Sequence, residues 1–331
     1  MVCITLKLYF TREEIMNDLF QGMEYVYTVY KEKSFSKAAK SLFISQPSLS
    51  ATIKRVENRI GYPIFDRSTK PLTLTECGQK YIQAIEHILA IEGSFHDYVN
   101  DWGELKTGNL VLGGSSLYSS LVLPSMMRKF SKKYPAVKVV LVEESTSKLE
   151  EMLLEGSIDM FIDNCSLDEE IYAHSVYQKE HLFLAVPRRM PINQTVQEYQ
   201  IPAEKIKDGS YLLENPISVP LKLFADEPFV VLKQENDTRK RAMSICQDAG
   251  FTPQILFELD QQMTSYHITS SGMGISFVSD TLISQMPENS RVVYYKLDGK
   301  DSERNLSFYW KRGRYVSRAM EEFLKIAGAG R

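Results

Sequence analysis

Residues 34–56 read SFSKAAKSLFISQPSLSATIKRV, and this stretch decides how the first part of the chain folds. Its opening serines are typical of a helix start, and residues 37–43 then predict a short helix. Ser45 is placed to cap a further helix over 46–60, whose first turn tolerates Pro47. Two helices joined by so tight a turn indicate a helix-turn-helix, the motif that inserts its second helix into the major groove of DNA.

The flanking residues extend this unit in both directions. A periodic apolar pattern predicts a preceding helix over 17–32, and Gly61 marks the expected end of the helix that starts at residue 46. The segments 62–67 and 71–75 favour a two-stranded wing. A long helix is then predicted over 76–105, and since its apolar stripe has no core of its own, we expect it to be a dimerisation arm.

From Gly108 onward the pattern changes to strands that alternate with helices. The order strand-helix-strand-helix-strand over 109–163 predicts a parallel sheet with helices on both faces. The alternation resumes at residue 181 and continues toward the C-terminus, after an irregular, Pro-bearing excursion between residues 191 and 228. The expected fold class is therefore α/β, with two lobes that follow an all-α-plus-wing N-terminal part and a long linker helix.

These patterns also predict where the domains begin and end. The residues before Met16 look poorly connected to the helices that follow them. Such a segment is expected when translation starts upstream of the folded part. The expected segments are an atypical N-terminal extension over 1–15, a winged helix-turn-helix over 16–75, a linker and dimerisation helix over 76–106, and a C-terminal domain over 107–331, with lobe I at about 108–180 and 291–331 and lobe II at about 181–290.

The charge is distributed unevenly along the chain. With 39 Lys and Arg against 42 Asp and Glu in 331 residues, the net charge of −3 taken alone argues against nucleic acid as a partner. However, residues 31–80 hold ten basic and four acidic residues, whereas 81–106 hold one lysine and five acidic residues. A basic block of this kind is either a solvated face or the footprint of contact with a polyanion, and its coincidence with the predicted helix-turn-helix favours DNA.

The sequence offers little support for a metal-binding protein, a membrane protein or an enzyme. The four cysteines are scattered without a C-x-x-C pair or clustered histidines, so no metal site is expected, and reduced thiols fit a cytoplasmic location. We find no signal peptide and no apolar stretch of about 18 residues, so no membrane partner is expected. Because nucleotide-binding and nucleophile motifs are missing, we expect no enzyme, no catalytic residue and no cofactor. The alternative function is a cytoplasmic solute-binding sensor without direct DNA binding, which would not need residues 34–80.

A set of residues in the N-terminal part stands at fixed spacings typical of one family. They are Phe35-Ser36-Lys37-Ala38-Ala39, Ser45-Gln46-Pro47-Ser48-Leu49-Ser50, Ile53-Lys54-Arg55-Val56-Glu57, Gly61, Phe65-Asp66-Arg67, Leu74-Thr75 and Gly78. This set resembles the winged helix-turn-helix of LysR-type bacterial transcription regulators. The resemblance extends to Gly108-Asn109-Leu110 and to the run from Leu154 to Asp159, and it covers residues from about 16 to 327.

The resemblance implies a cytoplasmic transcription factor that binds double-stranded DNA as a homodimer or homotetramer, and that contacts RNA polymerase if it is an activator. It further implies C-terminal lobes of periplasmic-binding-protein type, with a small co-inducer in their cleft. Two departures stand out. Ala51 and Thr52 occupy positions where the family often has Arg and Gln, which removes a possible guanine reader. The segment from Pro191 to Phe224 is longer than expected for the family, which leaves open that it covers or reshapes the cleft, and no function is assigned to it.

Base contacts are expected from the start of the second helix of the motif, because that turn points into the major groove. Gln46 can pair with adenine through its amide, and Pro47 and Ala51 offer apolar contact to a thymine methyl group. Lys54 and Arg55 follow one to two turns later, where side chains reach phosphates. The full set expected to contact DNA is Ser34, Ser36, Lys37, Ser45, Gln46, Pro47, Ser48, Ser50, Ala51, Lys54, Arg55, Arg67 and Lys70.

Several members of this set have an alternative interpretation. Ser48 and Ser50 are either base contacts or simply solvated helix residues. The segment from Ser34 to Lys37 opens a helix whose backbone N–H groups can hold a phosphate. Arg67 and Lys70 flank the tip of the wing as phosphate or minor-groove probes, although Arg67 can instead pair with Asp66 or Glu57.

Candidate effector residues follow three successive strands of the C-terminal domain. Ligands of open α/β sheets bind at the carboxyl ends of the strands. Ser115 and Ser116 lie at such an end and precede a helix, so they are either effector contacts or a simple N-cap. A helix N-terminus favours an anion, and the resembling family often binds small anions there, so an anionic effector is expected. Thr146, Asp163 and Asn164 occupy equivalent positions after the next two strands.

Overall fold

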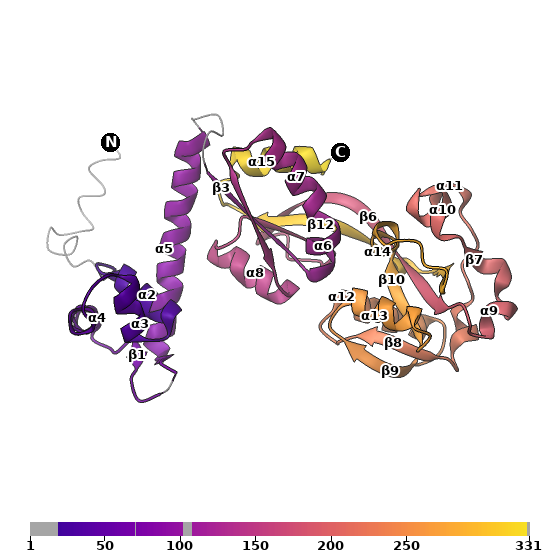
Figure 1. The fold of residues 1–331 in the computed structure, drawn as a ribbon, viewed down its shortest axis with the longest axis horizontal. Coiled ribbons are helices and arrows are strands. Elements are labelled where there is room, and N and C mark those ends of the chain that lie inside the picture. Colours follow the sequence, from indigo (N-terminus) through magenta and orange to yellow (C-terminus); the bar gives the residue numbers. More distant parts are fainter. Residues whose placement is uncertain (1–18, 70, 102–107, 330–331) are drawn as a thin grey trace. The chain divides into compact units, whose positions relative to one another are not determined.

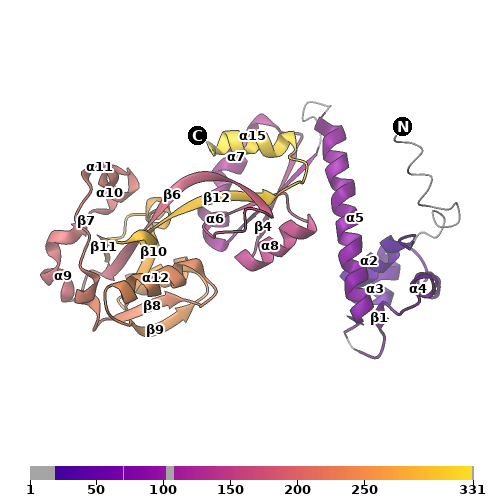
Figure 2. The same cartoon turned by 180° about the vertical axis from the view of Figure 1, so that it is seen from behind.

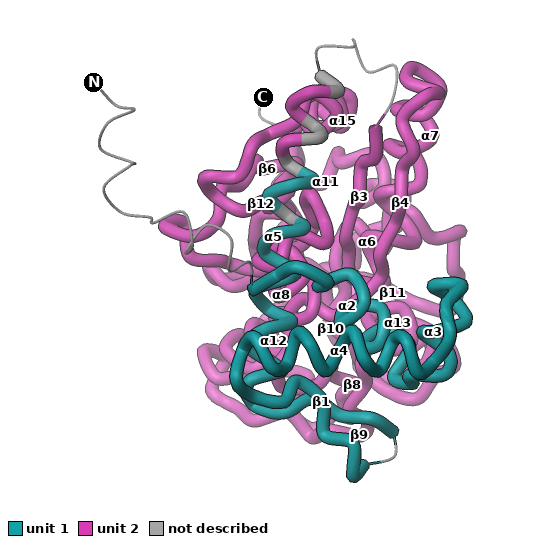
Figure 3. Tube along the Cα trace, turned by 90° about the vertical axis from the view of Figure 1, so that its left-hand side faces the viewer, with its two compact units in different colours: residues 1–93 teal, residues 94–331 magenta. Residues whose placement is uncertain are grey.

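The computed structural model describes residues 19–69, 71–101 and 108–329, and its elements are labelled in Figures 1 and 2. The chain divides into two units, Met1–Gly93 and Ser94–Arg331, which Figure 3 colours separately. The expected extension over 1–15 lies outside the described residues. Within the described ranges, no helix combines the length and the apolar character that crossing a membrane requires.

The first unit contains the predicted helix-turn-helix and wing. Gly22, at a φ of 87°, forms the N-cap of the first helix, which therefore begins six residues later than the predicted Asn17. Gly61, at a φ of 85°, ends the longest helix of the motif, as predicted. The elements are α2 (Met23–Glu32), α3 (Phe35–Ser41), α4 (Gln46–Ile60), the antiparallel wing strands β1 (Phe65–Asp66) and β2 (Thr73–Leu74), and the long helix α5 (Glu76–Asp101).

The core of this unit consists of the apolar faces of its helices. Ala38 and Ala39 are buried, and their small side chains let α3 approach its neighbours closely. The buried face of α4 is the predicted stripe at 3- and 4-residue spacing, apart from its half-buried last member, Ile60. The first turns of α5 complete the core with Tyr81, Ile82 and Ile85.

The wing is tied to the helices at two points. The Glu57 carboxylate of α4 accepts hydrogen bonds from the backbone N–H groups of Ile64 (2.9 Å) and Phe65 (3.3 Å). At Gly78, near the start of α5, an added Cβ would lie 2.0 Å from the carbonyl oxygen of Ile64. The start of α5 therefore approaches the wing so closely that only glycine fits.

The second unit begins with a parallel three-stranded arrangement, β4-β3-β5, as predicted. The predicted helix over 120–133 is two helices instead, because the backbone turns at Val122 and Pro124 restarts the helix. The elements are β3 (Asn109–Gly114), α6 (Ser116–Leu121), α7 (Leu123–Lys133), β4 (Lys138–Glu143), α8 (Thr146–Glu155) and β5 (Met160–Asp163).

Two long strands, β6 (Tyr172–Pro187) and β12 (Glu303–Lys311), pair antiparallel and connect the two lobes (Figures 1 and 2). The first half of β6 pairs with β12, and its second half pairs with β10 (Ile275–Ser279) and β11 (Val292–Lys296). The sheet is therefore mixed and not wholly parallel. The strand β11 lies in the second lobe, so the return to the first lobe occurs in β12 and not at the expected residue 291.

The second lobe places helices around the remaining strands. Its elements are α9 (Ile192–Thr195), β7 (Gln200–Ile201), α10 (Ala203–Lys207), α11 (Ser210–Glu214), β8 (Pro228–Leu232), α12 (Asp237–Asp248), β9 (Gln254–Leu259), α13 (Gln262–Ser270) and α14 (Asp280–Gln285), with 3-10 turns at Gln197–Tyr199, Leu221–Phe224 and Lys300–Ser302. The last helix, α15 (Arg318–Ala327), packs against α7 of the first lobe through Phe323 and Phe130. The excursion over 191–228 is thus a set of short helices that buries Tyr211 and Phe224.

We predict that Gly78→Ala destabilises the protein by about 1–3 kcal/mol, because the new methyl group would overlap a backbone carbonyl that cannot move without displacing the wing. Gly93→Ala is the matched control, since nothing lies within 4 Å of a Cβ at that position of the same helix. Thermal denaturation followed by circular dichroism measures both variants. Equal melting temperatures for the two would show that α5 does not approach the wing this closely.

Candidate functional site

The outer face of α4 carries the residues that were expected to read DNA. Leu49, Ile53 and Val56 are buried on its inner face. On its outer face the side chains of Gln46, Pro47, Ser48, Ala51, Lys54 and Arg55 are exposed, and that of Ser50 is half-buried. The Arg55 guanidinium donates to Thr52 Oγ1 at 3.0 Å, one turn earlier on the same helix. The exposed face therefore presents an amide and small apolar groups at its start and two cations further along.

Two of the expected DNA contacts are helix caps in the structure. Ser45 Oγ accepts a hydrogen bond from the backbone N–H of Ser48 at 3.3 Å, and Ser34 Oγ accepts one from Lys37 at 3.4 Å. The serines fix where α3 and α4 begin. Ser36 and Lys37 stay exposed at the start of α3.

The wing contributes Arg67, whose side chain is 47% exposed. Its guanidinium forms an ion pair with Glu57 at 3.1 Å and lies 5.1 Å from the centre of the Phe35 ring. The alternative interpretation, pairing with Glu57, is thus observed, and it holds Arg67 beside α4 with part of its surface open. Lys70 lies outside the described residues.

Phe43 was missed in the sequence. It lies in the turn between α3 and α4, is 95% exposed and has a left-handed φ of 55°. The sequence had placed it as the last residue of the predicted helix over 37–43, whereas α3 ends at Ser41.

A cleft of about 740 Å³ lies between the lobes of the second unit, at the carboxyl ends of β3, β4 and β5. Ser115, Ser116, Thr146, Asp163 and Asn164 all line it, so three separate strand ends bring the five candidate effector residues together. The facing wall comes from the starts of α12 and α13. No residue of the 191–228 excursion lines the cleft, so this segment does not cover it.

On the first-lobe side of the cleft, the side chains of Thr146 and Asp163 are hydrogen-bonded to each other. The Thr146 hydroxyl donates to Asp163 Oδ2 at 3.0 Å, and the backbone N–H groups of Asn164 and Cys165 donate to Oδ1 at 2.7 and 3.3 Å. Burial nevertheless raises the pKa of the Asp163 carboxyl to about 6. In contrast, Ser115 is the N-cap residue of α6, but its hydroxyl makes no capping hydrogen bond. Ser115 therefore lines the cleft with a hydroxyl that does not cap the helix.

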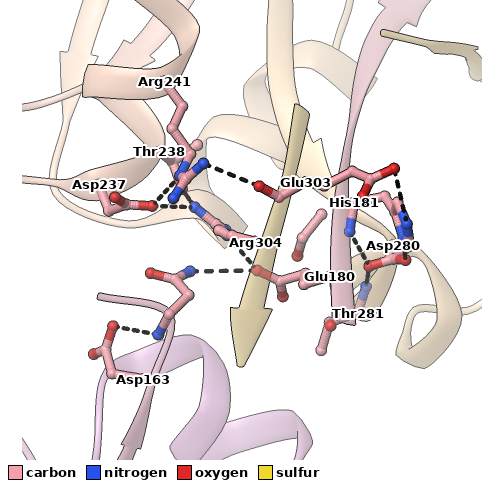
Figure 4. Close-up of polar contacts among 12 residues, drawn as sticks. Asp163, Glu180, His181, Asp237, Thr238, Arg241, Asp280, Thr281, Glu303 and Arg304 are labelled. Carbon is pink, nitrogen blue, oxygen red and sulfur yellow. Dashed lines mark hydrogen bonds and ion pairs between the residues drawn. The ribbon is translucent and has the colours of Figure 1, made fainter. Parts of the chain in front are cut away.

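The floor of the cleft is a buried charge network centred on Arg304 of β12 (Figure 4). Its Nε donates to Glu180 at 2.6 Å, and its Nη1 donates to Asp237 and to the Thr238 hydroxyl, each at 2.9 Å. Burial has the largest single effect and opposes the charge on the guanidinium, but Glu180, Tyr118 and Asp237 together outweigh it and raise the pKa of Arg304. The Tyr118 hydroxyl donates to Glu180 from the first lobe.

Sequence reasoning missed most of this floor. Glu180 and Arg304 are separated by 124 positions in the chain, and neither belongs to a motif. The Asn164 side chain, which was expected in the cleft, lies within hydrogen-bond distance of the Tyr118 hydroxyl. When the amide is turned so that its oxygen faces Arg304, that oxygen also accepts from the guanidinium. The only local signal was the start of α12, where Asn236 caps the helix and Asp237 follows.

Comparison with known proteins matches both units. Residues 20–79 match the model of the bacterial regulatory helix-turn-helix protein, lysR family, and residues 103–330 match the LysR substrate binding domain. Among curated relatives, the uncharacterized HTH-type transcriptional regulator YcgK of Bacillus subtilis is 27% identical over 312 residues, which covers 92% of each chain. A probable RuBisCO transcriptional regulator of Trieres chinensis is 26% identical and covers 92% of this chain and 94% of the relative.

Solved structures show the same fold at lower identity. Full-length CbnR complexed with its target DNA has a TM-score of 0.65 at 17% identity, over 93% of this chain and 98% of that one. A full-length variant of OxyR from Pseudomonas aeruginosa has a TM-score of 0.67 at 19% identity, over 92% of each chain. Since the two family models span both units, the chain belongs to the LysR family, as a DNA-binding transcriptional regulator with an effector-binding domain.

Proposed function

We propose that this protein is a cytoplasmic regulator, without enzymatic activity of its own, that reads double-stranded DNA with the outer face of α4 and responds to a small molecule bound in the cleft. The observation that carries the proposal is the convergence of candidate residues from three strand ends on one cleft of about 740 Å³. A cleft of this volume suits a ligand of metabolite size. If the protein is an activator, it contacts RNA polymerase as well.

The proposed reading of DNA divides α4 into two parts. The exposed start of the helix, with Gln46, Pro47 and Ala51, contacts base edges in the major groove. Lys54 and Arg55 contact phosphates, and so do Lys37 at the start of α3 and Arg67 on the wing. The phosphate contacts position the protein on the duplex, and the amide of Gln46 selects the sequence.

The proposed dimer forms through α5. This helix exposes a row of large apolar side chains beyond the helix-turn-helix core, among them Ile91 at 71% and Phe95 at 66%. Ile88, Ile91, Phe95 and Tyr98 follow one another at intervals of three and four residues, the spacing of a coiled-coil seam. A second copy of the helix would cover this row. Residues 102–105, the last of the predicted helix, lie outside the described residues.

We predict that Gln46→Ala weakens binding to the specific DNA site by about 1–3 kcal/mol and leaves non-specific binding nearly unchanged, because the amide pairs with a base edge. Lys54→Ala is the contrasting variant: it weakens binding to all sequences alike and reduces the salt slope by about one unit. Gel-shift titrations over a range of salt concentrations measure both effects. An equal loss on specific and non-specific DNA for Gln46→Ala would contradict base reading, and a wild-type protein without salt-sensitive binding to DNA near its gene would favour the solute sensor.

We predict that Ser115→Ala combined with Ser116→Ala abolishes the response of DNA binding to effector and preserves DNA binding itself, since these hydroxyls line the cleft and lie outside the helix-turn-helix unit. The measurement is a gel shift with and without an effector identified by a thermal-shift screen of metabolites, in which a ligand raises the melting temperature of the native state. Ser120→Ala, at an exposed position of α6 outside the cleft, is the control. A normal response in the double variant would refute the assignment of the cleft.

We predict that Ile91→Lys combined with Phe95→Lys converts the dimer to a monomer, because charges in an apolar seam remain unpaired when two helices meet. Sedimentation equilibrium gives the molecular mass of each variant. Gln83→Lys, at an exposed polar position of the same helix, is the control. A double variant that stays dimeric would place the interface elsewhere.

A further inference from the structure

The walls of the cleft carry the opposite charge from the one that an anionic effector requires. On the first-lobe wall, between Ser115 and Leu167, the described lining residues include four carboxyl groups and no Lys, Arg or His. These carboxyl groups are Glu143 at the end of β4 and Glu144 directly after it, Glu150 on α8, and Asp163 at the end of β5. Among the described residues none of the four forms an ion pair with a basic side chain.

The positive charges that line the cleft are already neutralised, with one exception. Arg304 is bound to Glu180 and Asp237, with 1% of its side chain exposed. Lys233 forms an ion pair with Asp260 at 2.6 Å. The remaining lining cation in the described part of the chain is Lys240, an exposed residue of α12 on the opposite wall, which also carries the exposed Glu235. An anion placed against Ser115 would therefore meet four carboxyl groups and no available cation on its own wall.

The backbone of this wall offsets only part of that charge. Two helices start on it, α6 with six residues and α8 with ten, and a helix N-terminus carries a partial positive charge of only about half an elementary charge, so the four carboxyl groups still dominate. Hydroxyl groups accept hydrogen bonds as readily as they donate them, so Ser115 and Ser116 suit a ligand N–H as well as an oxyanion. The Thr146 hydroxyl donates its proton to Asp163 and therefore offers a ligand only an acceptor. The first-lobe wall is thus rich in hydrogen-bond acceptors and poor in charged donors.

We propose that the effector of this protein carries at least one protonated amino or guanidinium group, which the carboxylates of the first-lobe wall bind. The inference rests on the proposed function, because the effector site is assigned from the cleft and from the family of the domain; the carboxylates decide only the class of ligand. Each N–H of such a cation makes a charge-assisted hydrogen bond to a carboxylate or a hydroxyl of this wall. An ammonium group removed from water between the two walls needs these acceptors, since an unpaired buried charge is strongly unfavourable.

The test compares ligands of equal chain length and opposite charge. The full-length protein, free of DNA because polyamines bind DNA themselves, is titrated with 1,4-diaminobutane, its guanidinium analogue agmatine, and the dicarboxylate succinate at constant ionic strength. Isothermal titration calorimetry gives the affinity, and the melting temperature gives an independent readout. We expect the two cations to bind and raise the melting temperature and succinate to do neither.

Variants then locate the bound cation. Glu144→Gln and Glu150→Gln keep the size and an acceptor oxygen, so each weakens the affinity for 1,4-diaminobutane roughly tenfold by loss of one charge-assisted contact. Glu155→Gln is the matched control, because this residue is also on α8 but does not line the cleft, and its affinity stays unchanged. The melting temperatures of the ligand-free variants verify that all three fold.

The outcomes separate this inference from the proposed function. Binding of succinate without binding of either cation, or cation affinities equal in all three variants, overturns the inference and leaves effector control in the cleft intact. If neither charge class binds and the metabolite screen also yields no ligand, the proposed effector function fails together with the inference.

Discussion

A single buried ion pair, between Arg304 and Glu180, holds the centre of the effector-binding unit together. The two residues lie opposite each other on the paired strands β6 and β12, and their side chains are 1% and 0% exposed. Burying two charges costs several kcal/mol for each ion unless good geometry and further hydrogen bonds compensate. Here Tyr118 of the first lobe completes the shell of Glu180, and Asp237 of the second lobe completes that of Arg304.

This network connects the response to a ligand with the arrangement of the lobes. Tyr118, Asp237 and Arg304 line the cleft and also hold its floor. A ligand that contacts them therefore interacts with the same groups that link one lobe to the other. A ligand shifts a conformational equilibrium only through its different affinity for the two states, and we propose that contacts with these shared groups are the source of that difference. Because Arg304 is neutralised by Glu180 and Asp237, the carboxylates of the first-lobe wall determine the charge of the cleft.

Local signals predicted the DNA-binding unit well. Caps such as Ser45 and Gly61 and the periodicity of α4 depend on residues at most four positions apart, so they can be read directly from the chain. Prediction failed where a strand forms only by pairing with residues far away in the sequence. In β6 only residues 181–186 were expected to form a strand, because the preceding residues 172–180 are largely polar and become a strand through β12, more than 120 positions away.

The sequence by itself determined the order of elements, the outer face of α4 and the five residues that follow three strand ends, because capping, periodicity and the rule that ligands bind at carboxyl ends need no knowledge of distant partners. Only the tertiary structure decided that Arg67 pairs with Glu57 and that Arg304 is neutralised. The sign of the cleft's charge belongs to this second group. It depends on which cations already have carboxylate partners, and pairing across 124 positions is a property of the folded chain alone.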